Sequence, residues 1–162
     1  MPVKILIVDD HEIVRQGIRS LLTRSRPEWE ICGEATNGRD AIEAVRNLKP
    51  DVVILDVTMP VMSGLEAAQQ IRKLGVSTRV LIFTMHESKR LAGEVREVGA
   101  HGVVLKVQAA RDLIQAIDAL LAGGTFFGGL EETESKSEGK SSAASGPVIG
   151  AIFFRALAFY PI

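Results

Sequence analysis

The sequence contains little that could fix its fold covalently or draw it to a charged surface. It has one cysteine, Cys32, among 162 residues, so no internal disulfide can form. We expect a core thiol in a reducing compartment. Lysine and arginine total 19 against 20 aspartates and glutamates, and the net charge of −1 gives no overall attraction to nucleic acid or membrane. The chain starts in a strand pattern without a signal peptide, which predicts a cytoplasmic protein.

Long hydrophobic runs are also missing. The most apolar stretch, residues 148–160, is shorter than the ~20 residues of a membrane-spanning helix and is interrupted by Arg155. It follows the small, polar and aperiodic segment 131–145, which is typical of a flexible linker. We therefore expect one globular domain over residues 1–124, followed over 125–162 by a linker and an atypical apolar tail that is not globular. The tail could dock on the domain, contact another chain or be a non-functional extension.

The chain does contain a regular alternation of strand and helix patterns. Apolar runs predict strands over 3–8, 29–35, 52–55, 79–84 and 102–106, the second alternating weakly as an edge strand does. Apolar residues at helical spacing follow each strand and include Ile13, Ile18 and Leu22 in the first helix. Ser63 and Glu66 are spaced like a capping box. This alternation predicts an α/β fold, a doubly wound five-stranded parallel sheet with helices on both faces.

Polar side chains follow four of the predicted strands directly. Asp9 and Asp10 close the first strand, Asp56 the third, Thr84 the fourth and Lys106 the fifth. In the flavodoxin-like order 2-1-3-4-5, the first and third strands are neighbours at the topological switch point, so three carboxylates would share one crevice. Such carboxylates either raise one another's pKa or recruit a hard divalent cation, for which Mg²⁺ is well suited.

An acidic crevice with Mg²⁺, an ammonium and a hydroxyl is suited to handling a phosphoryl group, with Asp56 as the nucleophile. Each residue also has a structural interpretation. Asp10 could cap the first helix, Asp9 could solvate a loop, and a single Thr84 or Lys106 at a strand end is often structural. Their recurrence at the ends of four strands favours a shared site.

These motifs together resemble a known family. The segments ILIVDDHE around Asp9, VILDVTMPVMSG around Asp56, FT at Thr84 and VVLK at Lys106 are similar to the CheY-like receiver domains of two-component response regulators. The resemblance covers about residues 1–124 in order and spacing. Residues 10–19, DHEIVRQGIR, further resemble receivers of NarL/LuxR-type regulators.

The resemblance implies a phosphorelay role for the acidic crevice. Asp56 would accept a phosphoryl group from a histidine kinase or phosphotransfer protein. Mg²⁺ would be held by three carboxylates and a backbone carbonyl, those of Asp9, Asp10, Asp56 and Thr58. Thr84 and Lys106 would contact the phosphoryl oxygens. Such a domain is not an enzyme beyond slow self-catalysed phosphotransfer and dephosphorylation.

In this family, phosphorylation draws the threonine inward and repacks an aromatic residue three positions before the lysine. That position is Val103 here, and Val107 stands where proline usually follows the lysine. The surface that changes lies over residues 88–97, 102–106 and 110–121. This surface, or the first and last helices, is where the resemblance would place a homodimer or heterodimer contact.

The output of the chain departs from the NarL/LuxR pattern. Such regulators continue into a helix-turn-helix domain, but residues 125–162 contain no pair of capped amphipathic helices and no basic footprint. We therefore expect a receiver without its effector, and no DNA binding by this chain. The favoured function is a phosphorylation-dependent switch of partner binding. The alternative is a constitutive interaction or dimerisation module. A small-ligand binder fits less well, because the first strand–helix turn offers carboxylates instead of a glycine loop.

Overall fold

Strands and helices alternate throughout the computed structural model, which describes residues 1–128 and 130. The strands are β1 (Lys4–Val8), β2 (Glu30–Ala35), β3 (Val52–Leu55), β4 (Arg79–Thr84) and β5 (Gly102–Leu105). The helices are α1 (Glu12–Ser25), α2 (Gly38–Leu48), α3 (Gly64–Lys73), α4 (Leu91–Glu97) and α5 (Ala109–Leu121), with a short 3₁₀ turn, η1 (Lys106–Gln108), before α5. None of the helices in this part of the chain is both long enough and apolar enough to cross a membrane.

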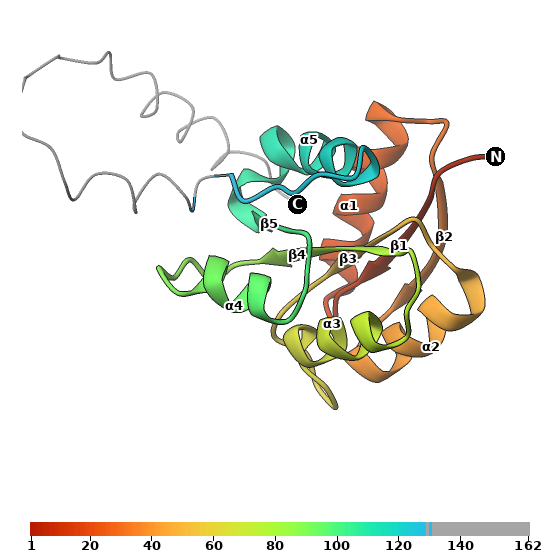
Figure 1. Cartoon of the computed structure of the whole chain (residues 1–162). Helices are drawn as coiled ribbons and strands as arrows, with labels where there is room; N and C mark the ends of the chain where they lie inside the picture. Colours follow the sequence, from red (N-terminus) through yellow and green to blue (C-terminus); the bar gives the residue numbers. More distant parts are fainter. Residues whose placement is uncertain (129, 131–162) are drawn as a thin grey trace, which may run out of the picture.

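The five strands form one parallel sheet in the order β2-β1-β3-β4-β5. This order confirms the predicted topology, including β2 as an edge strand. Helices α1 and α5 cover one face of the sheet, and α2, α3 and α4 cover the other (Figure 1). The first and third strands are therefore neighbours, as a site at their carboxyl ends requires.

Alternating side chains divide the core between the two faces of the sheet. In β1, Ile5 and Ile7 pack with the buried residues of α1 and α5, whereas Leu6 and Val8 pack with those of α2, α3 and α4. All four are at most 1% exposed. Burial on both faces explains why the central strands are unbroken apolar runs. The rigid sheet then presents whatever residue follows each strand at one common edge.

Some local features agree with the sequence pattern and others do not. Ser63 accepts from the Glu66 amide and Glu66 reaches back to the Ser63 amide, which confirms the capping box of α3. Ile13, expected on the inward face of α1, is 55% exposed. Cys32 is half-buried, and burial raises the pKa of its thiol. A thiol with a raised pKa is mostly protonated and therefore a poor nucleophile.

Packing against the core continues past residue 124, where the sequence pattern predicts the domain to end. Phe126 forms a parallel bridge with Gly102; its amide donates to the His101 carbonyl at 3.2 Å, and its carbonyl accepts from the Val103 amide at 2.8 Å. Phe127 is 6% exposed and Leu130 is 8% exposed. We call residues 126–128 and 130 the return segment. Residues 129 and 131–162 of the expected linker and tail lie outside the described residues.

Gly102 allows the return segment to approach β5 closely. A Cβ atom at Gly102 would lie 2.6 Å from the Phe126 carbonyl oxygen. The strand edge and residue 126 therefore meet at a distance that only glycine permits without rearrangement. The Phe127 ring then lies beneath the Arg96 guanidinium, 4.0 Å from the ring centre, and in the same cluster as Val103.

Candidate functional site

The strand register brings the polar residues at the strand ends together. Val8 pairs with Leu55, so Asp9 and Asp56 leave adjacent strands side by side, and the Asp56 amide donates to the Val8 carbonyl at 3.0 Å. On the other side, Thr84 pairs with Leu105, directly before Lys106. Because β4 lies between β3 and β5, Thr84 stands between Asp56 and Lys106 along this edge.

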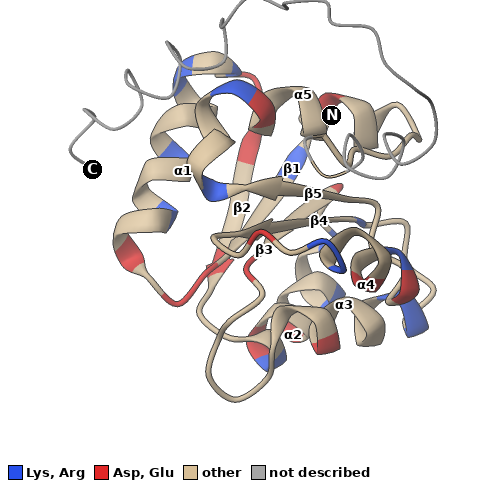
Figure 2. Ribbon diagram, turned by 90° about the vertical axis from the view of Figure 1, so that its left-hand side faces the viewer, with Lys and Arg blue, Asp and Glu red and all other residues tan. Residues whose placement is uncertain are grey.

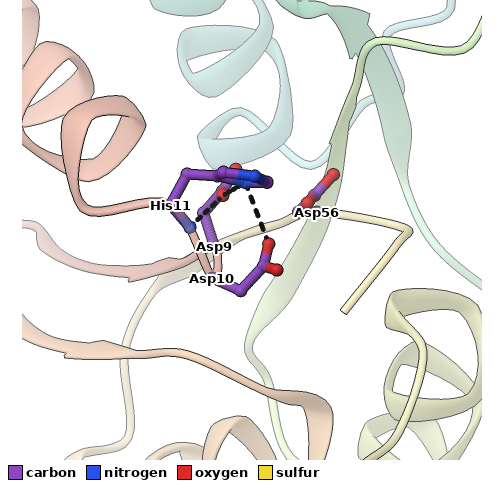
Figure 3. A group of neighbouring side chains, drawn as sticks. All are labelled: Asp9, Asp10, His11 and Asp56. Carbon is purple, nitrogen blue, oxygen red and sulfur yellow. Dashed lines mark hydrogen bonds and ion pairs between the residues drawn. The ribbon is translucent and has the colours of Figure 1, made fainter. Parts of the chain in front are cut away.

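Three carboxylates and one imidazole gather at this edge. Asp9, Asp10, His11 and Asp56 each offer one ligand atom, and these atoms lie within 4.8 Å of one another. Figure 3 shows Asp9, Asp10 and His11 on the loop after β1, with Asp56 beside them. The His11 Nδ1 atom is 3.2 Å from Asp9 Oδ1 and 3.0 Å from Asp10 Oδ1. Carboxylate oxygens at this spacing could hold a hard divalent cation.

Asp9 is completely buried, and each of its polar atoms has a partner. Its amide donates to the Ala35 carbonyl at 3.1 Å, and its carbonyl accepts from Arg15 Nη1 at 2.8 Å. Its Oδ1 atom accepts from the His11 amide at 2.9 Å, and its Oδ2 atom from Lys106 Nζ at 2.6 Å. A buried carboxylate needs such compensation, since an unpaired one would be very costly. Asp9 therefore anchors the site instead of solvating a loop.

Lys106 connects the two buried carboxylates. Its ammonium lies 2.6 Å from Asp9 Oδ2 and 3.3 Å from Asp56 Oδ1, and its side chain is 9% exposed. Two neighbouring carboxylates repel each other, and this ammonium offsets part of that repulsion. The same ammonium lies where it can also meet the oxygens of an anion placed on Asp56.

Asp56 is the buried carboxylate with room to react. It is 5% exposed, and burial, with the Asp9 charge second, raises its pKa against the opposing effects of Lys106 and the Val57 amide. Its Oδ1 atom accepts from the Val57 amide at 2.9 Å and lies near Lys106. Within residues 1–128 and 130, its Oδ2 atom accepts no hydrogen bond, so a lone pair on this oxygen is available.

Gly64 packs directly against the backbone of Asp56. A Cβ atom at Gly64 would lie 1.8 Å from the Asp56 carbonyl oxygen, and the Gly64 amide donates to the Val57 carbonyl at 2.8 Å. The start of α3 therefore lies directly against the end of β3, and only glycine fits there. This contact determines how the loop over residues 56–63, which includes the exposed Thr58, leaves the sheet.

The two predicted switch residues are both buried. Thr84 has no exposed surface and its Oγ1 atom accepts from the His86 amide at 3.1 Å. Val103 is also fully buried, in one cluster with Leu91, Val95 and Phe127. An aromatic ring therefore does lie beside this part of β5, but Phe127 of the return segment supplies it.

The structure also settles one structural alternative and adds two residues. His11, not Asp10, is the residue at the N-terminal boundary of α1, and no side-chain hydrogen bond caps this helix. Asp10 is therefore free of the capping role. His11 and Arg15, which contact Asp9, were not singled out from the sequence. Their spacing after Asp10 is the only signal that could have pointed to them.

Comparisons with known proteins agree with this architecture. Residues 5–118 match the family described as "Response regulator receiver domain". The chain is 40% identical over 124 residues to the transcriptional regulatory protein YdfI of Bacillus subtilis, covering 76% of this chain and 57% of YdfI. It is 34% identical over 122 residues to the nitrate/nitrite response regulator protein NarL of Escherichia coli, covering 75% of this chain and 56% of NarL.

A crystal structure of a LuxR-family two-component response regulator from Aurantimonas sp. superposes with a TM-score of 0.74. It is 39% identical to this chain and covers 78% of it, and 90% of that structure is matched. The chain thus spans little more than half the length of the two curated relatives described above.

Proposed function

Because the chain belongs to the response regulator receiver domains of two-component systems, and resembles those of the NarL/LuxR type, we propose that it accepts a phosphoryl group on Asp56 and thereby switches its binding to partners. The observation that carries this proposal is the buried arrangement of Asp56 between Asp9 and Lys106, with one carboxylate oxygen left without a donor. This oxygen is not among the fully buried atoms that lack a partner in the described residues, so solvent, and with it a phosphodonor, can reach it.

The donor in this proposal is the phosphohistidine of a sensor kinase or phosphotransfer protein. Asp56 Oδ2 attacks the phosphorus, an O–P bond forms, and the P–N bond to the donor imidazole breaks. The electron pair of that bond stays on the imidazole nitrogen, which takes a proton from solvent. Lys106 meets one phosphoryl oxygen with its ammonium, and the Thr84 hydroxyl meets another by donating a hydrogen bond.

Mg²⁺ is the cation we assign to Asp9, Asp10 and Asp56, with the Thr58 carbonyl as a fourth ligand. All-oxygen donors of this kind match its preference, and its charge would offset that of the phosphoryl oxygens. Asp9 and Asp56 share the charge of a single ammonium between them, so the cluster of three carboxylates retains negative charge. That excess favours a divalent cation.

Labelling by acetyl phosphate tests the proposal. Wild-type protein should gain one phosphoryl group in a Mg²⁺-dependent manner, measured by intact mass, and Asp56→Asn should gain none. Asp118→Asn is a matched control, because Asp118 pairs with Arg26 and is distant from the site in sequence and fold. Phosphate on Asp56→Asn at the wild-type level would contradict the assignment of the acceptor. Calorimetry should also detect weaker Mg²⁺ binding to Asp10→Asn.

Partner switching in this proposal depends on Thr84 and Val103. Thr84 moves toward the phosphoryl group, and the vacated space is refilled from the cluster that contains Val103 and Phe127. Val103 is small, so the change over α4, β5 and α5 should be modest. Amide exchange with and without beryllofluoride should show its largest protection after Asp56 and Thr84. A larger response in α4 than in these loops would contradict a modest change.

We propose that a second receiver docks on one of two surfaces. The first is formed by α4, β5 and α5, and the second by α1 and α5. Residue 126 of the return segment already pairs with the outer edge of β5. A partner on the first face would therefore contact side chains, because the edge amide of Val103 is already bonded. Sedimentation of the phosphorylated and unphosphorylated chain would measure any such pairing. Receivers that pair identically in both states would support the constitutive module instead of the switch.

A further inference from the structure

The turn that carries Asp9 and Asp10 is held by a residue outside the acidic cluster. Arg15, on the first turns of α1, donates from Nη1 to the Asp9 carbonyl at 2.8 Å. This carbonyl belongs to the peptide that joins Asp9 to Asp10. Its orientation fixes where the Asp10 backbone begins. The Asp10 carboxylate lies 3.0 Å from His11 Nδ1, whereas Lys106 contacts the Asp9 carboxylate.

Arg15 is itself held from the edge strand β2. Its side chain is 14% exposed, and its Nε atom lies 3.5 Å from Glu34 Oε2. That nitrogen is buried and has no hydrogen-bond acceptor within the described residues, so the ion pair with Glu34 is its main compensation. Arg19 holds the other Glu34 oxygen at 2.9 Å. The chain of contacts runs from Arg19 through Glu34 and Arg15 to the Asp9 carbonyl.

We propose that Arg15, oriented by Glu34, is a positioning residue that holds the Asp9–Asp10 turn in the geometry that binds the divalent cation. This inference rests on the function proposed above, because it concerns the same cation. A planar guanidinium suits the role, since it can meet two acceptors in fixed directions at once. The Asp9 amide and carboxylate are held by other residues, and Arg15 holds the remaining polar backbone atom of Asp9, its carbonyl oxygen.

A positioning role and a simple charge effect predict opposite signs. Basic residues lie along α1 (Figure 2), and a nearby positive charge by itself weakens the binding of a cation. If only the charge of Arg15 mattered, Arg15→Met would bind Mg²⁺ more tightly and Arg15→Lys would bind as the wild type does. If Arg15 positions the turn, both variants bind Mg²⁺ more weakly, because neither can meet both acceptors.

The test is calorimetric titration of the unphosphorylated full chain with MgCl₂, together with the half-saturating Mg²⁺ concentration for acetyl phosphate labelling. We expect Arg15→Met to weaken Mg²⁺ binding about tenfold, the lower end for groups that orient metal ligands. Arg15→Lys should lose less. The labelling rate at saturating Mg²⁺ should be restored to near the wild-type rate, which loss of folding would not allow. Tighter or unchanged Mg²⁺ binding by both variants would overturn the proposal.

Arg24→Met is the matched control. It removes the same charge from the same helix, but the Arg24 guanidinium donates to Ser20 Oγ at 3.2 Å and is not part of the contacts that link Glu34 and Arg15 to Asp9. Its Mg²⁺ affinity should stay within twofold of the wild type; a loss equal to that of Arg15→Met would contradict positioning. Glu34→Gln should weaken Mg²⁺ binding, and Glu34→Gln combined with Arg15→Met should be no weaker than Arg15→Met alone. Additive losses would show that Glu34 does not act through Arg15.

The outcomes separate this inference from the function on which it rests. If the wild-type chain neither binds Mg²⁺ nor labels on Asp56, the proposed function fails and the inference fails with it. If the wild type does both and the Arg15 variants match it, only the inference fails. If Arg15→Met does not fold, Arg15→Lys decides the question, because it keeps the positive charge and binds Mg²⁺ more weakly only if Arg15 positions the turn.

Discussion

Replacing Phe127 by alanine tests whether the return segment is part of the folded domain. Phe127 is 6% exposed, packs in the cluster of Val103 and lies beneath Arg96. Phe-to-Ala changes in a core cost about 3–5 kcal/mol, and an exposed cation–π contact adds about 0.5–1 kcal/mol. The segment follows the last helix and can relax toward the space left by the ring. We therefore expect a loss of about 2–3 kcal/mol, at or below the low end of the core range.

Differential scanning calorimetry and urea unfolding measure this loss. For a domain of this size, about 3–5 °C of Tm corresponds to 1 kcal/mol, so Phe127→Ala should melt roughly 6–15 °C lower. The urea m-value should not change, since the same surface is exposed on unfolding. Phe127→Leu keeps much of the apolar volume and should lose about half as much. Acetyl phosphate should still label Asp56 below the new Tm, because no atom of the site is removed.

A change of less than about 1 kcal/mol for Phe127→Ala would refute this reasoning, because a buried ring in a packed cluster cannot be removed so cheaply. It would mean that the return segment separates from β5 in solution. In that case, a chain that ends at residue 124 should also be as stable as one that ends at residue 130.

Three further predictions concern the site and the chain ends. Burial and the Asp9 charge raise the pKa of Asp56, so the folded state binds a proton on this carboxylate more tightly than the unfolded state does. The free energy of unfolding therefore falls as the pH rises from the ordinary aspartate pKa through the folded-state pKa. Asp56→Asn should therefore be more stable than the wild type at pH 7, by about 1 kcal/mol, with the gain lost below the ordinary aspartate pKa; urea midpoints over this pH range check the sign. Gly64→Ala places a Cβ atom 1.8 Å from the Asp56 carbonyl oxygen, so it should lower the free energy of unfolding by about 1–3 kcal/mol and slow the labelling of Asp56. Gly93→Ala is the control: its Cβ atom would have nothing within 4 Å, and its stability should be unchanged or slightly higher. Deleting residues 131–162 should leave labelling and Tm nearly unchanged and improve solubility, because an apolar sequence such as 148–160 promotes self-association. A Tm several degrees lower would show that the tail packs on the domain.

The core of the site was predictable because its residues follow strands directly. Buried parallel strands are recognisable as apolar runs, and the residue after each run leaves the sheet at its carboxyl edge. Asp9, Asp56, Thr84 and Lys106 were found in this way, and the strand order confirms that they share one edge. Ile13 was wrongly predicted to face the core and is exposed. Helical spacing assigns a residue to a face of the helix, but it does not show whether the first turn of α1 still lies over the sheet.

Contacts between distant residues were not predictable from any local pattern. Arg15 and Glu34 lie on a helix and on an edge strand, and both look like solvated surface residues. Only the fold brings Arg15 to the Asp9 carbonyl and Glu34 to Arg15. Phe126 and Phe127 follow the last helix without periodicity, so nothing in their spacing indicates that they return to β5. The upward shift of the Asp56 pKa likewise depends on burial and on the charge of Asp9, 47 residues away in the sequence.

The sequence alone determined the strands, the helices and the residues at the strand ends, because periodicities of two and 3.6 residues and apolar run lengths are local properties of the chain. The tertiary structure alone decided how Lys106 is shared between two carboxylates, which backbone atom Arg15 holds, and that Phe127 packs in the same core cluster as Val103. Those contacts exist only after the sheet has closed, because burial and pairing between remote segments depend on distances that no local spacing contains.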